Sequence, residues 1–122
     1  MVVLALSQAW LVVSALEQRE DVRITAHRGS SLKAPENTLS SIEQAINDGS
    51  DYIEIDVQLT ADGVPVLWHD ADMNRIFGLR KRISDVRYQD MRDLDAGSWF
   101  NTGFAKERIA TLAQAVKTAD GR

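Results

Sequence analysis

Two histidines, His27 and His69, and two closely spaced carboxylates, Glu54 and Asp56, are the residues of this sequence best suited to chemistry. Hard divalent cations prefer carboxylate oxygens as ligands, and histidine can take or give a proton near neutral pH. Such a set suits phosphoryl transfer, because a cation offsets phosphate charge while two imidazoles move protons. Arg28 follows His27 directly and offers the planar fork that binds a phosphate oxygen.

A predicted hairpin would bring three of these residues together. The alternating stretch 52–59 predicts one strand with Glu54 and Asp56 on the same face. An Asp-Gly pair, the strongest short-range hairpin signal, separates it from a second strand over 64–69. If that pair forms a two-residue turn, Asp56 lies opposite His69, about 5 Å away at Cβ. A longer loop would shift this register.

The preceding segment predicts a strand and a helix. Residues 22–27 alternate as a strand, and residues 38–48 have the apolar spacing of an amphipathic helix with Asn37 or Thr38 as its cap. With the strand over 52–59, they form a βαβ unit. His27 would then join the two carboxylates if both strands are neighbours in a parallel sheet.

The other predicted helices cover 84–94 and 111–119, and the pattern as a whole indicates an α/β fold. The 122 residues allow one domain or less. A formal net charge of −4 offers no cationic face for a phosphate backbone, so we do not expect nucleic acid as a partner. Without cysteine there is no disulfide and no thiolate metal site, so metal ligands must be oxygen or imidazole.

The apolar stretch 1–16 ends abruptly at the charged residues 17–21. It is shorter than the roughly 20 residues of a membrane span, and it lacks the cationic start and cleavage site of a secretory signal. Three interpretations stay open: a buried helix, the end of a membrane helix, or an interfacial anchor. We therefore divide the chain into an N-terminal segment, 1–21, and a domain, 22–122.

Each candidate site residue also has an ordinary structural interpretation. Paired carboxylates on a half-exposed strand usually form a solvated face, and a histidine at a strand end is usually structural. The agreement of register among the four residues nevertheless favours a functional site.

Ordered motifs along the chain closely resemble the glycerophosphodiester phosphodiesterase family. The motifs are His27-Arg28-Gly29, Pro35-Glu36-Asn37-Thr38, Glu54 to Thr60, Asp62-Gly63, His69-Asp70, Leu94 to Phe100 and Ile109 to Leu112. The resemblance implies a TIM (β/α)8 barrel of the phospholipase C-like phosphodiesterase type. It also implies divalent-cation-dependent hydrolysis of small glycerophosphodiesters to glycerol 3-phosphate and an alcohol, with Mg²⁺ or Ca²⁺ as the cation.

Residue roles carry over from the family by position. His27 and His69 match its acid/base histidines, Glu54 and Asp56 match two of its metal-binding carboxylates, and Arg28 matches its phosphate-contacting arginine. We expect three further residues to support the site: Glu36, Asn37 and Asp70.

Some features depart from the family pattern. Its third metal carboxylate and a nearby lysine would lie just past Arg122, and Ala110 stands where proline is usual. A barrel needs roughly 250 residues, so we expect the chain to hold the N-terminal part of the barrel and to be inactive alone. The alternatives are a noncatalytic truncated barrel, a module that binds a metal or a partner, and a membrane-anchored structural segment.

The charged junction after residue 16 also resembles membrane-tethered family members. We therefore expect membrane association through residues 1–16, with a soluble cytoplasmic enzyme as the alternative.

Overall fold

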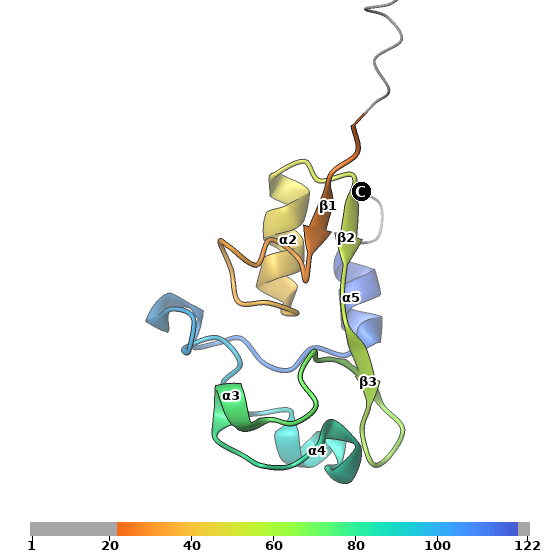
Figure 1. Ribbon diagram of the computed structural model, residues 1–122, viewed down its shortest axis with the longest axis vertical. Helices are drawn as coiled ribbons and strands as arrows, with labels where there is room; N and C mark the ends of the chain where they lie inside the picture. The colour runs from red at the N-terminus through yellow and green to blue at the C-terminus, as the bar shows by residue number, and fades with distance from the viewer. Residues whose placement is uncertain (1–21, 120–122) are drawn as a thin grey trace, which may run out of the picture.

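The computed structural model describes residues 22–119, and its N-terminal part is the predicted βαβ unit (Figure 1). Strand β1 (Thr25–His27), helix α2 (Leu39–Asn47) and strand β2 (Tyr52–Glu54) follow one another, and β1 pairs with β2 in parallel. The register places His27 beside Glu54 at the carboxyl ends of both strands. The predicted parallel neighbours are thus confirmed.

Helix α2 begins and ends where the sequence predicts. The Thr38 side chain accepts a hydrogen bond from the Ser41 amide, and the Ser41 hydroxyl accepts one from the Thr38 amide, so the two form a reciprocal N-cap. Gly49 follows the helix in the left-handed conformation, with φ of 75°. Ile42 and Ala45 are buried on one face, and this face holds the helix against the rest of the chain.

The predicted single strand over 52–59 is two short strands in two different sheets. Strand β3 (Val57–Leu59) is separated from β2 by two residues and pairs antiparallel with β4 (Pro65–Leu67). The chain leaves the first sheet because the Asp56 amide donates to the Asn37 side chain (3.0 Å) rather than to a neighbouring strand. The alternation therefore did not predict the break, and in β3 the apolar side chains of Val57 and Leu59 are exposed while Gln58 is half-buried.

The hairpin register differs by one residue from the predicted one. Val57 lies opposite Leu67 and Leu59 opposite Pro65, so the predicted pairing of Asp56 with His69 is wrong. The loop holds three residues rather than two, closed by a hydrogen bond from the Gly63 amide to the Thr60 carbonyl with Gly63 at φ of 78°.

The segment after the hairpin is irregular. It contains α3 (Asn74–Phe77), the 3₁₀ turns η1 (Ile83–Asp85) and η2 (Thr102–Phe104), α4 (Tyr88–Met91) and α5 (Leu112–Ala119). The predicted helix over 84–94 is wrong in part, because Val86 is extended and its carbonyl accepts the Ala61 amide of the hairpin loop. The helix predicted over 111–119 is confirmed as α5.

Two buried clusters organise the molecule. One belongs to the hairpin and the irregular segment: Val66, Trp68, Met73, Ile83, Met91, Ala96 and Ile109. The other joins α2 and α5 to the hairpin: Ile42, Leu67, Ala110 and Ala115. The hairpin region, residues 57–110, therefore has a core of its own, whereas the βαβ unit, residues 25–54, packs through α2 into a core that it shares with β4 and α5.

The prediction of membrane association through residues 1–16, like the division at residue 21, concerns a segment outside the described residues. Within residues 22–119, none of the helices has the length and apolar character needed to span a bilayer.

Candidate functional site

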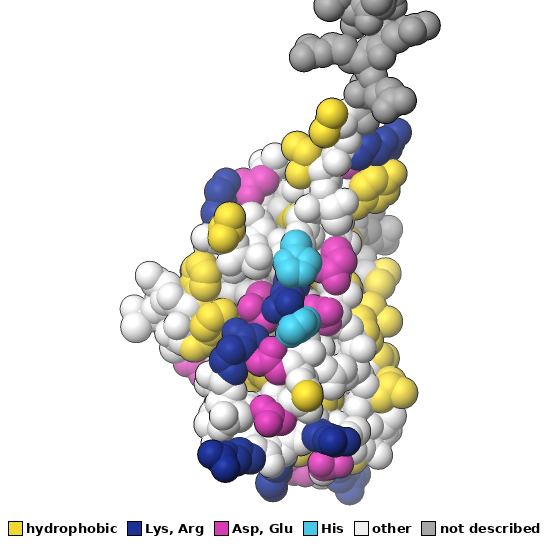
Figure 2. Space-filling view, in the orientation of Figure 1, with side chains coloured by type: hydrophobic (Ala, Val, Ile, Leu, Met, Phe, Trp, Pro, Cys, Tyr) yellow, Lys and Arg dark blue, Asp and Glu magenta, His cyan; other side chains and the backbone are white. Residues whose placement is uncertain are grey.

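Both histidines lie on one face of the molecule, with acidic and basic side chains between them (Figure 2). His27 ends strand β1, and its Nε2 lies 3.9 Å from Oε2 of Glu54 at the end of β2. Both side chains are open to solvent, at 70% and 41% exposed. The parallel register alone is enough to place this imidazole beside this carboxylate.

Arg28 connects the strand ends to the loop before α2. Its amide donates to Glu54 Oε2 (3.0 Å), and its Nη1 donates to Glu36 Oε1 (3.0 Å). Its Nε lies 3.5 Å from Asp56 Oδ2 and has no hydrogen-bond partner within residues 22–119, although the atom is buried. Three carboxylates thus surround this arginine.

The backbone around Arg28 is strained and tightly packed. Arg28 has φ of 56° and Gly29 has φ of 77°, a conformation that costs little only for glycine. A Cβ added at Gly29 would lie 2.3 Å from Ser41 Oγ. The Ser41 hydroxyl in turn donates to the Arg28 carbonyl (3.1 Å), so helix α2 directly fixes the loop that carries the guanidinium.

Asn37 holds Asp56 through both ends of its amide. Its Nδ2 donates to Asp56 Oδ2 and its Oδ1 accepts the Asp56 amide, each at 3.0 Å. Asn37 is 5% exposed and has φ of 55°, in the left-handed region that asparagine tolerates better than most residues. Asn37 therefore fixes the Asp56 carboxylate, and its supporting role in the site stays a prediction.

His69 reaches the site without the predicted strand pairing. It follows β4, where Gln58 Nε2 donates to the carbonyls of residues 68, 69 and 70 at 2.8 to 3.2 Å. Its Nδ1 lies 2.8 Å from Asp70 Oδ1, and the side chain is 41% exposed. The imidazole is thus oriented by the next residue rather than by an opposing strand.

Arg75 is a site residue that the sequence did not predict. Its Nε donates to Asp70 Oδ2 (2.6 Å) and its Nη2 to Glu36 Oε1 (2.7 Å). Hydrogen bonds from Arg75, and then from His69, lower the pKa of Asp70 below its usual value. The carboxylates of Asp70 and Glu36 raise the pKa of Arg75. No local spacing signals this contact, because 39 residues separate Arg75 from Glu36.

Comparison with known proteins assigns this arrangement to a family. The family profile described as "Glycerophosphoryl diester phosphodiesterase family" matches residues 27–122, a range that includes all of these side chains. The chain belongs to this family. The match begins at His27, the last residue of β1, and covers the rest of the βαβ unit and the hairpin region.

Individual family members are similar in sequence and in structure. The chain is 40% identical over 106 residues to glycerophosphodiester phosphodiesterase 1 of Bos taurus, which covers 85% of this chain and 32% of that protein. It is 43% identical over 89 residues to a glycerophosphodiester phosphodiesterase of Caldanaerobacter subterraneus. That match covers 73% of this chain and 37% of the relative. The chain thus spans about a third of the length of these curated relatives.

The solved structures agree. An Oleispira antarctica phosphodiesterase in complex with the product sn-glycerol-3-phosphate superposes with a TM-score of 0.76 at 40% identity, over 80% of this chain and 40% of that one. A glycerophosphodiester phosphodiesterase from Agrobacterium tumefaciens superposes with a TM-score of 0.74 at 33% identity, over 79% of this chain and 42% of that one. The described fold is therefore a fold that this family uses.

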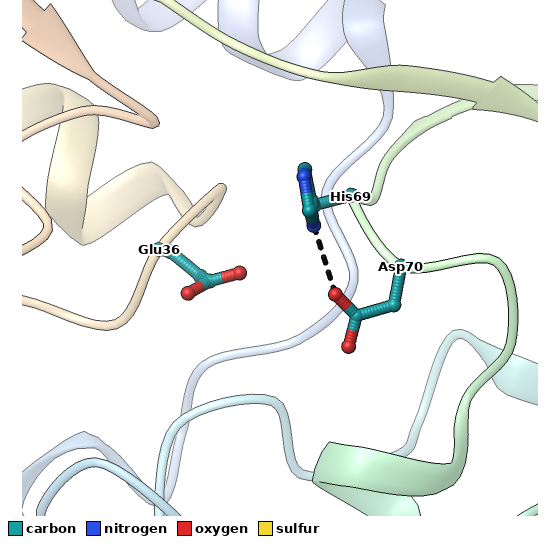
Figure 3. Close-up of side chains that lie close together, drawn as sticks. All are labelled: Glu36, His69 and Asp70. Carbon is teal, nitrogen blue, oxygen red and sulfur yellow. Dashed lines mark hydrogen bonds and ion pairs between the residues drawn. The ribbon is translucent and has the colours of Figure 1, made fainter.

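Family members generally use a divalent metal, and two groups of side chains in the described part of the chain offer ligand atoms. The first group consists of Glu36, His69 and Asp70 (Figure 3). Each of these residues offers one ligand atom, and the three atoms lie within 4.8 Å of one another. Arg75 already donates to both carboxylates of this triad, so a cation there would compete with a guanidinium.

Glu54 and Asp56, the carboxylates that the family resemblance predicts as metal ligands, lie outside this triad. Within residues 22–119, hydrogen bonds to Glu54 and Asp56 reach only Oε2 and Oδ2, which leaves Oε1 and Oδ1 free to accept. The site as a whole holds four carboxylates and two guanidinium groups. Its carboxylates therefore outnumber its guanidinium groups by two, which is an excess of negative charge. Hard oxygen donors and this charge excess suit a divalent cation.

Proposed function

We propose that the protein carrying this chain hydrolyses glycerophosphodiesters to glycerol 3-phosphate and an alcohol, at the end of a TIM (β/α)8 barrel to which the parallel strands β1 and β2 belong. The observation that carries the proposal is the convergence of His27, His69, Arg28, Glu54 and Asp56 on one face. The similarity to a phosphodiesterase whose structure contains the product sn-glycerol-3-phosphate supports the substrate class.

Glu54 and Asp56 would hold the divalent cation, Mg²⁺ or Ca²⁺, through the oxygens that accept no hydrogen bond from the described residues. Bound there, the cation would offset the negative charge of the phosphodiester. Asn37 would keep the Asp56 carboxylate turned toward this position, since both ends of its amide bind that residue.

Arg28 would bind a phosphate oxygen. Its guanidinium lies beside Asp56, with Nε 3.5 Å from Oδ2, and so next to the position proposed for the cation. A phosphate oxygen is the acceptor that a guanidinium fork matches best. Glu36 would hold the fork in place through Nη1.

His27 and His69 would move the protons of the reaction. One imidazole takes a proton from the nucleophile, either water or the neighbouring hydroxyl of the glycerol, and the other gives a proton to the departing alkoxide. Asp70 contacts Nδ1 of His69 and so directs Nε2 outward to the reacting atoms.

The test is divalent-dependent release of glycerol 3-phosphate from glycerophosphocholine by the intact protein. We expect release with Mg²⁺ or Ca²⁺, none with excess EDTA, and a loss of ~10²-fold or more in Glu54→Gln and Asp56→Asn, since each removes a charge from the site. Glu43→Gln, on the exposed face of α2, is the matched control and should retain full activity. Release that persists in EDTA, or in both site variants, would contradict the proposal.

A further inference from the structure

Arg75 joins two carboxylates that come from different regions of the molecule. Glu36 lies on the loop before α2, whereas Asp70 follows β4, and Figure 3 shows the two side chains facing each other across the site. Arg75, in α3, donates to Asp70 through Nε (2.6 Å) and Nη2 (3.2 Å) and to Glu36 through Nη2 (2.7 Å). The guanidinium therefore bridges the βαβ unit and the hairpin region.

Each of these carboxylates in turn holds a group of the proposed reaction. Asp70 Oδ1 lies 2.8 Å from Nδ1 of His69, and Glu36 Oε1 accepts from Nη1 of Arg28 at 3.0 Å. A continuous series of polar contacts thus runs from His69 to Arg28, with Arg75 at its centre.

We propose that Arg75 is the positioning residue of this site: by fixing Asp70 and Glu36, it sets the orientation of the His69 imidazole and of the Arg28 guanidinium. The proposal rests on the proposed function above, because it assigns His69 to proton transfer and Arg28 to phosphate binding.

The charges explain why the bridge is needed. Glu36 and Asp70 bring carboxylate oxygens within 4.8 Å of each other, and like charges at that distance repel. Without Arg75, the Asp70 carboxylate would lose its guanidinium partner and could rotate away from His69. Lysine could not replace the arginine, since a single ammonium lacks the planar fork that reaches both carboxylates.

Trp99 supports Arg75 from a segment that the proposed reaction does not otherwise use. Its ring centroid lies 5.4 Å from the Arg75 guanidinium carbon, within range of a cation–π contact. Trp99 Nε1 donates to the Ala96 carbonyl (2.9 Å), which anchors the ring in its own turn. The Gly-Ser-Trp-Phe motif of residues 97–100 thereby gains a role in holding the bridge.

The experiment is a kinetic comparison of variants of the intact protein on glycerophosphocholine, with inhibition by glycerol 3-phosphate as a measure of phosphate binding. We expect Asp70→Asn to lower kcat, and Glu36→Gln to raise KM and weaken product inhibition. Arg75→Met should do both, with kcat falling by ~10- to 100-fold. Arg75→Lys should not restore either parameter, and Trp99→Phe should change them least. Arg92→Met is the control, since Arg92 pairs only with the adjacent Asp93 in the described part of the chain.

A double variant separates positioning from general stability. If Arg75 acts through Asp70, then Arg75→Met combined with Asp70→Asn lowers kcat no further than the larger single effect. Multiplied losses, or wild-type kcat and KM in Arg75→Met, would overturn the inference. If Arg75→Met fails to fold, Arg75→Lys decides, because full activity with lysine would also overturn it. Inactivity of both the wild type and Arg92→Met would instead refute the proposed function.

Discussion

The βαβ unit, residues 25–54, and the hairpin region, residues 57–110, each supply one histidine to the same face but hold it by different means. His27 is placed by the strand register, which sets it beside Glu54. His69 lies outside any strand and is held by side chains, Gln58 on its backbone and Asp70 on its ring.

The cores of the two regions differ in the same way. The βαβ unit packs one face of α2 against α5 and β4. The hairpin region instead surrounds Trp68, Met73, Ile83 and Met91 with short turns, and the Trp68 ring stacks on Phe77 at 5.3 Å between centroids. Regular secondary structure thus positions the half of the site around His27. Irregular packing together with ion pairs positions the half around His69.

The largest expected effect is on turnover and compares the two histidines. In the intact protein, His27→Ala and His69→Ala should each lower kcat by ~10² to 10⁴-fold, because each removes a group that transfers a proton. Steady-state release of glycerol 3-phosphate measures both. Full retained turnover in either variant would show that the histidine of that region takes no part in the reaction.

The second comparison concerns the two cores. Ile83→Ala and Ile42→Ala each empty a fully buried site and should each lower the free energy of unfolding by about 2 to 5 kcal/mol. Amide hydrogen exchange distinguishes them: Ile83→Ala should accelerate exchange mainly in residues 64–109, and Ile42→Ala mainly in β1, α2 and β2. Equal acceleration throughout in both variants would mean that the two regions unfold as one unit.

The third comparison uses two glycines with left-handed backbones. Gly29→Ala should lower the free energy of unfolding by roughly 2 to 4 kcal/mol, since it adds a clash with Ser41 to the backbone strain. Gly63→Ala meets no atom within 4 Å and should cost only about 1 kcal/mol. Denaturant unfolding compares the two, and a cost at Gly63 equal to that at Gly29 would refute the packing argument.

The smallest expected effect is the acid dependence of the βαβ unit. Hydrogen bonds from Lys33, Ser30 and Gln44, with Lys33 the largest contributor, lower the pKa of Asp48 from 3.8 to about 2. Because the folded pKa is depressed, this stabilisation is present above pH 3.8 and is lost as the pH falls toward 2.

Asp48→Asn should therefore flatten the fall in stability between pH 4 and pH 2, and Lys33→Met should flatten it in part. Thermal unfolding across this range provides the measurement. An unchanged slope in both variants would show that the Asp48 contacts do not persist in solution.

The sequence predicted the βαβ half well for a physical reason. Helix periodicity, a capping threonine and strand alternation are local signals, and they placed α2 and the His27–Glu54 pair correctly. The hairpin half depended on non-local choices. One extra loop residue shifted the register, and the Asn37 contact with Asp56 divided a strand that alternation predicts to be continuous.

The site shows the same division. The resemblance to the family named its residues, and the structure brings His27, Arg28, Glu54, Asp56 and His69 to one face, while their roles stay predictions. Arg75 was missed, because its partners Glu36 and Asp70 become neighbours only when the two regions pack together.

The central claim is that both regions build one reaction centre, and the double variant His27→Ala with His69→Ala tests it most directly. If the two imidazoles act in the same reaction, the double variant of the intact protein should lose no more turnover than the more damaging single variant. Losses that multiply would contradict the account, since they would mean that the two histidines contribute independently.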